Sequence, residues 1–253
     1  MKKYVPLTLL FASLSAHAAT CGQIDRQAAQ AYQAMEQHAC CSDLFDEAKF
    51  NAAEARFAQV MQATNDVATW QCRFPEMQNA GIGMSRSADK KLRIFSWRIP
   101  TGGSMHEYAH MVQIQDGAGR VRESGFPESG SFGYVERIEQ DTLPQHGRVY
   151  LMFTHGVGFG RLHGKAVEWF SIKNNRLQPE KLFAAGKRVS SIDYAYEPHS
   201  QDKLPENFRH FVYDAKRRQL SFPVVRNTKA FEYGELTGKR IVYRFENGVF
   251  VRK

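Results

Sequence analysis

The sequence lacks two features that would assign it to a protein class at once. Beyond residue 18 it has no run of about 20 apolar residues, the length that a membrane-spanning helix requires. It has no C-x-x-C spacing and no cysteine after Cys72, so a zinc site built from cysteine pairs is not indicated. We therefore predict no transmembrane segment, and no disulfide in the long stretch that follows Cys72.

The N-terminus has the pattern of a secretory signal. A charged start at Met1-Lys2-Lys3 precedes an apolar core over 4–14, which is too short to span a bilayer comfortably. Ala16-His17-Ala18 matches an A-x-A cleavage site, so we expect cleavage after Ala18 and export to the periplasm. Cys21 lacks the leucine and the small residue that a lipobox places before its cysteine, so lipidation is not expected.

All four cysteines, Cys21, Cys40, Cys41 and Cys72, lie in the first third of the chain. In an oxidising compartment an even number of cysteines indicates disulfides. If two helices pack antiparallel, Cys21 can pair with Cys72 and leave Cys40–Cys41 as a vicinal pair. If the first helix is shorter or bent, Cys21 and Cys72 would each pair with one member of the Cys40/Cys41 pair. Vicinal disulfides are uncommon, so the second pairing is favoured.

Composition indicates a folded chain with uneven charge. A hydrophobic content of 43% with 12% aromatics excludes global disorder. Residues 19–80 carry four basic and eight acidic side chains; with two lysines in 1–18 and +8 in total, residues 81–253 carry +10. An exported protein rarely meets nucleic acid, so the expected partner of this basic part is an acidic protein or an anionic envelope component.

The spacing of apolar residues changes along the chain from helical to alternating. Helical spacing predicts two helices, over 24–39 and 46–64, with Asp43 or Asp46 capping the second. From about residue 90 the pattern has period two and predicts strands.

Three hairpin turns are predicted within the β region. They fall at Asn174-Asn175, near Ala215-Lys216 and at Asn247-Gly248. The hairpins would also suit a propeller, but only four blades would fit, so one antiparallel body is favoured. The fold prediction is α+β: a signal peptide (1–18), a short disulfide-bonded helical segment (19–80) and a mainly antiparallel β sandwich or open barrel (81–253).

One motif suggests metal chemistry. His106-Glu107-Tyr108-Ala109-His110 matches H-E-x-x-H, in which a helix brings two histidines together on zinc and the glutamate acts as base. The residues from 108 to 115 also alternate as a strand does, and in a strand the two histidines would lie roughly 13 Å apart. The strand interpretation is favoured, so we predict no metal ligands, no catalytic residues and no cofactor.

A glycine-rich segment joins two predicted strands. It runs from His155 to Gly164 and fails the G-x-G-x-x-G pattern of dinucleotide sites. The functional interpretation is a surface loop that contacts a partner through His155, Phe159 and His163. Trp97 and His106 complete the candidate binding residues. Glu128 to Gly133 resembles a nucleophile elbow only loosely and is read as a loop.

The segment from Arg93 to His106 carries S-W-x-x-x-T-G-G-S-M-H, and two further stretches, Leu177 to Phe183 and Tyr213 to Val225, accompany it. These residues resemble a family of uncharacterised exported bacterial proteins with an S-W-x-x-x-T-G-G-[ST]-M-H segment. The resemblance covers roughly residues 90–252, and Arg98 replaces an acidic residue of that family. Because the family has no assigned activity, the resemblance implies architecture and export alone.

These observations together favour a non-catalytic periplasmic binding protein over an enzyme. It would recognise a protein or an envelope component through its basic β face, in a role such as an inhibitor or immunity protein. The alternative is a zinc-dependent hydrolase that uses His106, Glu107 and His110.

Overall fold

The computed structural model describes residues 20–125, 133–160 and 162–253. The predicted signal peptide and the Glu128–Phe132 part of the elbow-like segment lie outside these residues. The helices are α1 (Cys21–His38), α2 (Glu47–Gln62) and α3 (Pro75–Asn79), with 3-10 turns η1 (Ala63–Asn65), η2 (Val67–Thr69) and η3 (Pro198–Lys203). None of these helices is long and apolar enough to cross a bilayer.

Three sheets carry the rest of the described chain. Sheet A holds β1 (Gly83–Arg86), β2 (Leu92–Ile99), β3 (Glu107–Gln115) and β4 (Val121–Ser124), in that order. Sheet B has the order β11 (Ser191–Tyr196), β7 (His163–Lys173), β6 (Gly147–Val157) and β5 (Tyr134–Leu143), and β8 (Arg176–Pro179) pairs with β7. Sheet C has the order β10 (Lys187–Val189), β9 (Phe183–Ala185), β15 (Val249–Arg252), β14 (Glu235–Glu246), β13 (Gln219–Arg226) and β12 (Val212–Asp214).

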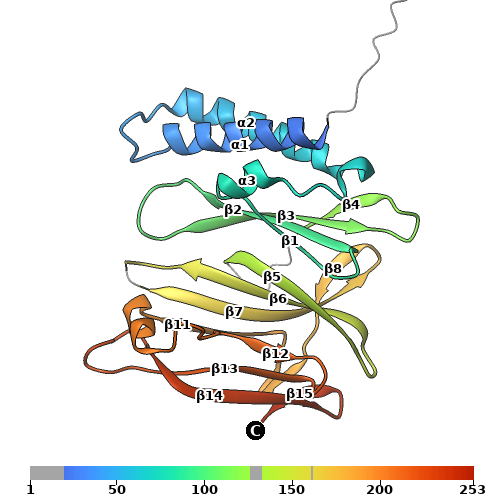
Figure 1. The fold of residues 1–253 in the computed structure, drawn as a ribbon, viewed down its shortest axis with the longest axis vertical. Coiled ribbons are helices and arrows are strands. Elements are labelled where there is room, and N and C mark those ends of the chain that lie inside the picture. The colour runs from blue at the N-terminus through green and yellow to red at the C-terminus, as the bar shows by residue number, and fades with distance from the viewer. Residues whose placement is uncertain (1–19, 126–132, 161) are drawn as a thin grey trace, which may run out of the picture.

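The helices and the three sheets stack as four layers, with the helices covering sheet A and sheet C lying farthest from them (Figure 1). Every strand pair is antiparallel except β15 with β9, so the predicted α+β class and mainly antiparallel body are confirmed. Each of the three predicted hairpin turns is present. Asn174, Asn175 and Asn247 have the positive φ that tight two-residue turns require.

Three apolar clusters fill the spaces between the layers. The first joins both long helices to sheet A and includes Tyr32, Phe57 and Phe95. The second lies between sheets A and B and includes Ile94 and Met152. The third lies between sheets B and C and is the most aromatic; its members are Leu143, Val149, Leu151, Phe153, Val167, Trp169, Leu182, Phe183, Phe211, Leu220, Phe222, Tyr243 and Phe250. Sheets A and B therefore each present alternate residues to two different cores, whereas sheet C presents one face to a core.

The favoured disulfide pairing is wrong. Cys21 is bonded to Cys72, and Cys40 and Cys41 are free and exposed. α1 and α2 pack antiparallel, so the start of α1 and the segment after α2 meet at one end (Figure 1). The 18 residues of α1 carry Cys40 and Cys41 to the opposite end, roughly 27 Å away, where neither Cys21 nor Cys72 can reach them.

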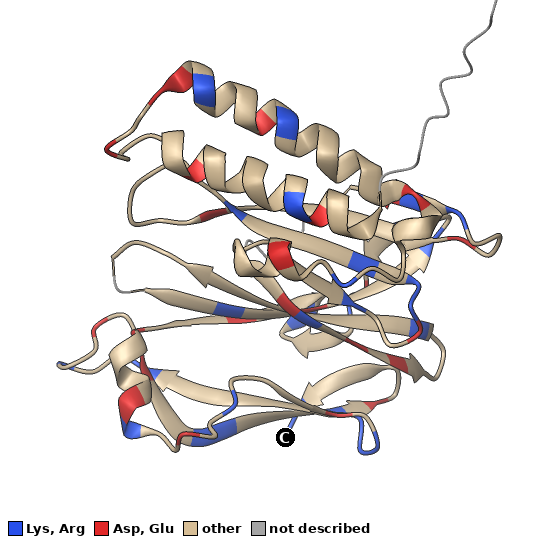
Figure 2. Cartoon of the chain, turned by 45° about the horizontal axis from the view of Figure 1, so that its top comes forward, with Lys and Arg blue, Asp and Glu red and all other residues tan. Residues whose placement is uncertain are grey.

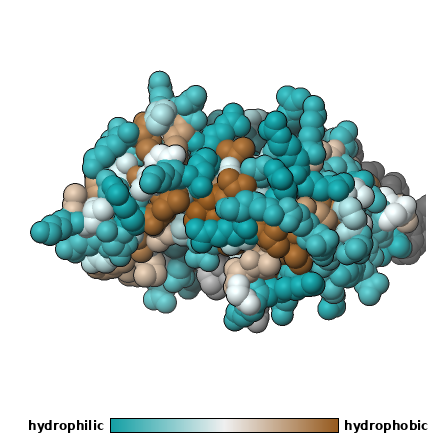
Figure 3. Space-filling model, turned by 90° about the horizontal axis from the view of Figure 1, so that it is seen from below, coloured by the Kyte–Doolittle hydropathy of each residue, from teal (hydrophilic) through white to brown (hydrophobic). Residues whose placement is uncertain are grey.

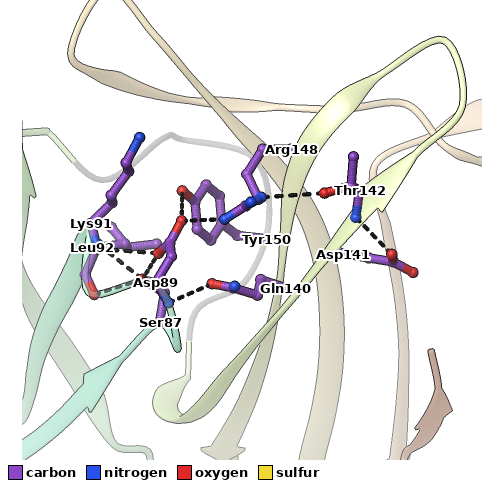
Figure 4. Close-up of polar contacts among 9 residues, drawn as sticks. All are labelled: Ser87, Asp89, Lys91, Leu92, Gln140, Asp141, Thr142, Arg148 and Tyr150. Carbon is purple, nitrogen blue, oxygen red and sulfur yellow. Dashed lines mark hydrogen bonds and ion pairs between the residues drawn. The ribbon is translucent and has the colours of Figure 1, made fainter. Parts of the chain in front are cut away.

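A polar cluster around Asp89 ties sheet A to sheet B at the end of the molecule that holds the disulfide (Figure 4). One Asp89 carboxylate oxygen accepts from Ser87 Oγ at 2.7 Å and from the Lys91 amide at 3.1 Å. The other accepts from Arg148 at 2.8 Å and from the Tyr150 hydroxyl at 2.9 Å. Burial alone would raise the pKa of Asp89, but these donors outweigh it and lower the pKa. The cluster fixes one end of the A–B interface. The candidate functional site lies at the opposite end.

Candidate functional site

The end of the molecule opposite the disulfide is formed by loops from all layers; we call it the loop end (Figure 1). It brings together the α1–α2 loop (39–46), the β2–β3 loop (100–106) and the β6–β7 loop (158–162, of which residue 161 is not described). The His106 amide donates to the Val157 carbonyl at 3.0 Å and thereby fixes the second of these loops to β6. Large apolar side chains are exposed at this end: Leu44, Phe45, Met105 and Phe159, the last 77% exposed.

A cavity of about 320 Å³ opens between sheets A and B at the loop end; we call it the glycine groove. Gly156 and Gly164 are paired across β6 and β7 and form part of its floor, and Met105 and His106 form part of the opposite wall. A side chain added at Gly164 would meet nothing closer than the Gly156 carbonyl oxygen at 4.0 Å. The groove therefore exists because these strand positions carry no side chain, and it presents backbone and apolar surface to a ligand.

On the other face of sheet B, polar rings gather in what we call the imidazole cluster: His155, His163, His210, Tyr194 and Tyr196, with Lys165 and Glu136. His155 Nε2 lies 3.1 Å from His163 Nδ1, and the Tyr194 hydroxyl lies 2.8 Å from His210 Nδ1. His163 packs on Tyr196, and Tyr196 packs on His210 with ring centroids 4.8 Å apart. The Lys165 amine donates to the Glu136 carboxylate, so the one amine of the cluster is already paired with the one carboxylate.

The three histidines of the imidazole cluster are uncharged at neutral pH. Burial lowers the pKa of His155 to about 4, with the Lys165 charge as the second cause. Burial, and then the same lysine, lower the pKa of His210 to about 4 and also lower that of His163. Neutral imidazoles both donate and accept hydrogen bonds, so at neutral pH the cluster offers polar contacts without net positive charge.

The sequence predicted five binding residues, and the structure brings four of them together. His106, His155, Phe159 and His163 all belong to the loop end. Trp97 lies apart from them, on the helix-facing side of sheet A, where its ring meets Phe57 edge-on at 5.2 Å. The sequence could not separate Trp97 from the others, because alternation does not say which face of a strand a helix covers.

The structure also places residues at the loop end that the sequence did not single out. Tyr194 and Tyr196 alternate along β11 and lie opposite Lys165 and His163 of β7. The alternation, combined with a correct prediction that β11 pairs with β7, would have identified both tyrosines as members of the cluster. His210 gave no such signal, since it precedes β12 and reaches the cluster only through tertiary packing.

The H-E-x-x-H motif does not form a helix. His106 precedes β3, and Glu107 and His110 belong to that strand, as the favoured interpretation predicted. His110 faces Ser96 across the sheet at 3.0 Å, and burial lowers its pKa to about 4. Within the described ranges no three His, Cys, Asp or Glu side chains are grouped as metal ligands would be.

Comparisons with protein-family models, with curated proteins and with solved structures found no match. The resemblance to exported proteins with an S-W-x-x-x-T-G-G-[ST]-M-H segment therefore stays a prediction, and the functional argument depends on the geometry of the loop end.

Charge does not mark another candidate binding surface as clearly as exposed apolar side chains mark the loop end. Lys and Arg residues alternate with Asp and Glu residues along the strands and turns (Figure 2). The outer face of sheet C shows short apolar patches separated by hydrophilic side chains (Figure 3), and its Val242 and Val251 are half-buried. The loop end differs because its exposed apolar side chains are large and one of them, Met105, lines a cavity.

Proposed function

We propose that the protein is an exported, periplasmic binding protein that recognises a partner protein through the loop end. The observation that carries this proposal is the set of exposed apolar side chains on three neighbouring loops, two of which, the β2–β3 loop and the β6–β7 loop, line the glycine groove. Clustered exposed apolar residues mark interaction sites, and aromatic anchors next to pockets contribute most of the binding energy in protein interfaces. The Cys21–Cys72 disulfide is compatible with an oxidising compartment.

A protein partner suits this surface better than an anionic envelope component. The three histidines of the imidazole cluster are neutral and the Lys165 amine is paired with Glu136, so these described residues offer no free positive charge to an anionic surface. Loops held by a rigid sheet scaffold are common positions for binding residues, and an inhibitor or immunity protein is one role that such a surface serves. The zinc-hydrolase alternative is not carried further, because His106 and His110 stand on extended backbone.

The proposal is tested by photo-crosslinking from defined positions. A photoreactive phenylalanine analogue would replace Phe159 in one variant and Val67 in another. Val67 is the matched control, because it is 56% exposed but lies near the disulfide, at the far end of the molecule. We expect a discrete crosslinked partner in periplasmic extract from position 159 and none from position 67. Equal products from both positions, or none from the loop end, would refute the proposal.

A second variant separates binding from folding. Gly164→Val adds a side chain to the glycine groove at a position where its Cβ meets nothing closer than 4.0 Å, and a β-branched residue suits a strand better than glycine does. We expect its melting temperature to equal or exceed that of the wild type, and its affinity for the crosslinked partner to fall at least about tenfold, or about 1.4 kcal/mol. Unchanged affinity in this variant would exclude the groove from the interface.

A further inference from the structure

Cys40 and Cys41 are adjacent thiols at the loop end. Their Sγ atoms lie 3.3 Å apart, both residues are exposed, and neither takes part in the disulfide between Cys21 and Cys72. Cys41 has φ 69, a left-handed conformation that a non-glycine residue adopts only at some energetic cost. Two exposed sulfurs within contact distance need little movement to bond to each other.

The pair lines a second cavity of about 250 Å³, which we call the dithiol cavity. Its other walls include Arg98 and the Thr101-Gly102-Gly103 turn. A Cβ on Gly102 would stand 3.1 Å from Cys41 Sγ and 3.0 Å from the Cys40 carbonyl oxygen, so Gly102 leaves room for the thiols. The first glycine of the T-G-G motif therefore avoids crowding Cys40 and Cys41. The Arg98 guanidinium is paired with Glu36, another residue of the cavity wall, at 3.0 Å.

We propose that Cys40 and Cys41 form a thiol–disulfide exchange site whose co-substrate is a low-molecular-weight disulfide that enters the dithiol cavity. One cysteine thiolate attacks a sulfur of the disulfide, forms a mixed disulfide and expels the first thiolate with the bonding electron pair. The second cysteine thiolate then attacks the cysteine sulfur of that mixed disulfide and expels the second thiolate. The two cysteines lose two protons and two electrons, and the co-substrate becomes two thiols.

The environment assigns an order to the two sulfurs. Cys41 Sγ is the sulfur next to Gly102 in the cavity wall, since a Cβ on Gly102 would stand 3.1 Å from it. A disulfide that enters the cavity beside Gly102 therefore meets Cys41 first, which makes Cys41 the attacking sulfur and Cys40, whose Sγ lies 3.3 Å away, the resolving one. The product is a bond between neighbouring residues, and exposed, strained disulfides of this kind are readily reduced again. The site is thus reversible, unlike the Cys21–Cys72 bond.

Incubation of the full chain with oxidised and reduced glutathione in varied ratio tests the proposal. Samples are quenched with acid, alkylated, digested and analysed by mass spectrometry. We expect the peptide with Cys40 and Cys41 to lose two hydrogens under oxidising ratios and to regain them under reducing ratios, while Cys21 stays linked to Cys72. Stable glutathione adducts on both cysteines, a persistent dithiol, or exchange of Cys40 or Cys41 into the Cys21–Cys72 bond would each overturn it.

Variants test the order and the cavity. Cys40→Ser should accumulate a glutathione adduct on Cys41, because the resolving sulfur is gone; absence of that adduct contradicts the assignment. In this background Gly102→Ala should slow adduct formation several-fold by crowding Cys41, whereas Gly119→Ala should leave the rate unchanged. Gly119, in the turn between β3 and β4, is the matched control, since its φ of +79 equals that of Gly102 and a Cβ on it would meet nothing within 4 Å. Equal rates in the two variants would exclude entry through the cavity.

Discussion

At the scale of the residue, Arg93 shows how the helical segment is fixed to sheet A. Its side chain is fully buried, and it donates to Gln113 at 2.7 Å and to the carbonyls of Thr69 and Thr64 at 2.8 and 2.7 Å. Its guanidinium also stacks over Trp70 at 4.6 Å. A buried charge is tolerated only when its donors are satisfied, so this residue couples the 3-10 turns after α2 to the strands beneath them.

The histidines of the imidazole cluster make stability depend on pH. His155 and His210 have folded pKa values of about 4, below the ordinary 6.5 of an unfolded chain. Their contribution is therefore full above pH 6.5 and is lost as the pH falls towards 4, because the unfolded state binds protons first. We expect the wild type to lose about 2 kcal/mol more than a His155→Gln/His210→Gln variant between about pH 7 and pH 5, after discounting for partial exposure.

Urea unfolding at each pH measures this difference. His199→Gln is the control for the removal of an exposed histidine, since the His199 side chain is 79% exposed. Parallel pH profiles for the wild type and the double variant would show that the cluster does not hold these rings neutral.

At the scale of the element, local sequence specified the helices and hairpins well. α1 begins at a capping box between Thr20 and Gln23, and Asp46 caps α2 as predicted. The predicted limits of 24–39 and 46–64 lie within a few residues of the observed helices. The error in disulfide pairing arose because all four cysteines were expected to pair without a vicinal bond, whereas the antiparallel packing of α1 and α2 joins Cys21 to Cys72 and leaves Cys40 and Cys41 as free thiols.

The Cys21–Cys72 bond should contribute more to stability than any other link of the helical segment. It closes a loop with a sequence separation of 51, so replacing both cysteines by serine should lower the free energy of unfolding by about 4 kcal/mol. The matched variant, Cys40→Ser/Cys41→Ser, removes two exposed thiols and should change it by less than about 1 kcal/mol. Comparable losses in the two variants would contradict the pairing.

At the scale of the whole molecule, the four layers share their apolar cores, so no layer is complete alone. The cluster beneath the helices contains residues of α1 and α2 together with Phe95 and Met111 of sheet A. The boundary between residues 80 and 81 stays a prediction as a domain limit. The core of the helical segment nevertheless continues into the β region.

A chain reduced to residues 81–253 tests this dependence. It would expose Phe95, Trp97 and Met111 and leave Arg93 without the carbonyls of Thr64 and Thr69. We expect it to bind a hydrophobic dye and to lose the cooperative unfolding of sheet A, measured by calorimetry and by the dispersion of its NMR spectrum. A well-dispersed spectrum with a single sharp transition would show that the β region folds independently.

The sequence by itself determined the α+β class, the helices, the hairpin turns and the extended state of the segment that carries His106 and His110. These depend on periodicities and turn residues within a few positions of each other. Only the tertiary structure decided that Cys21 meets Cys72, that His210 joins His155 and His163, and that three loops form one end. Each of these depends on which faces the layers bury, because burying apolar surface acts between residues far apart in sequence and has no local signature.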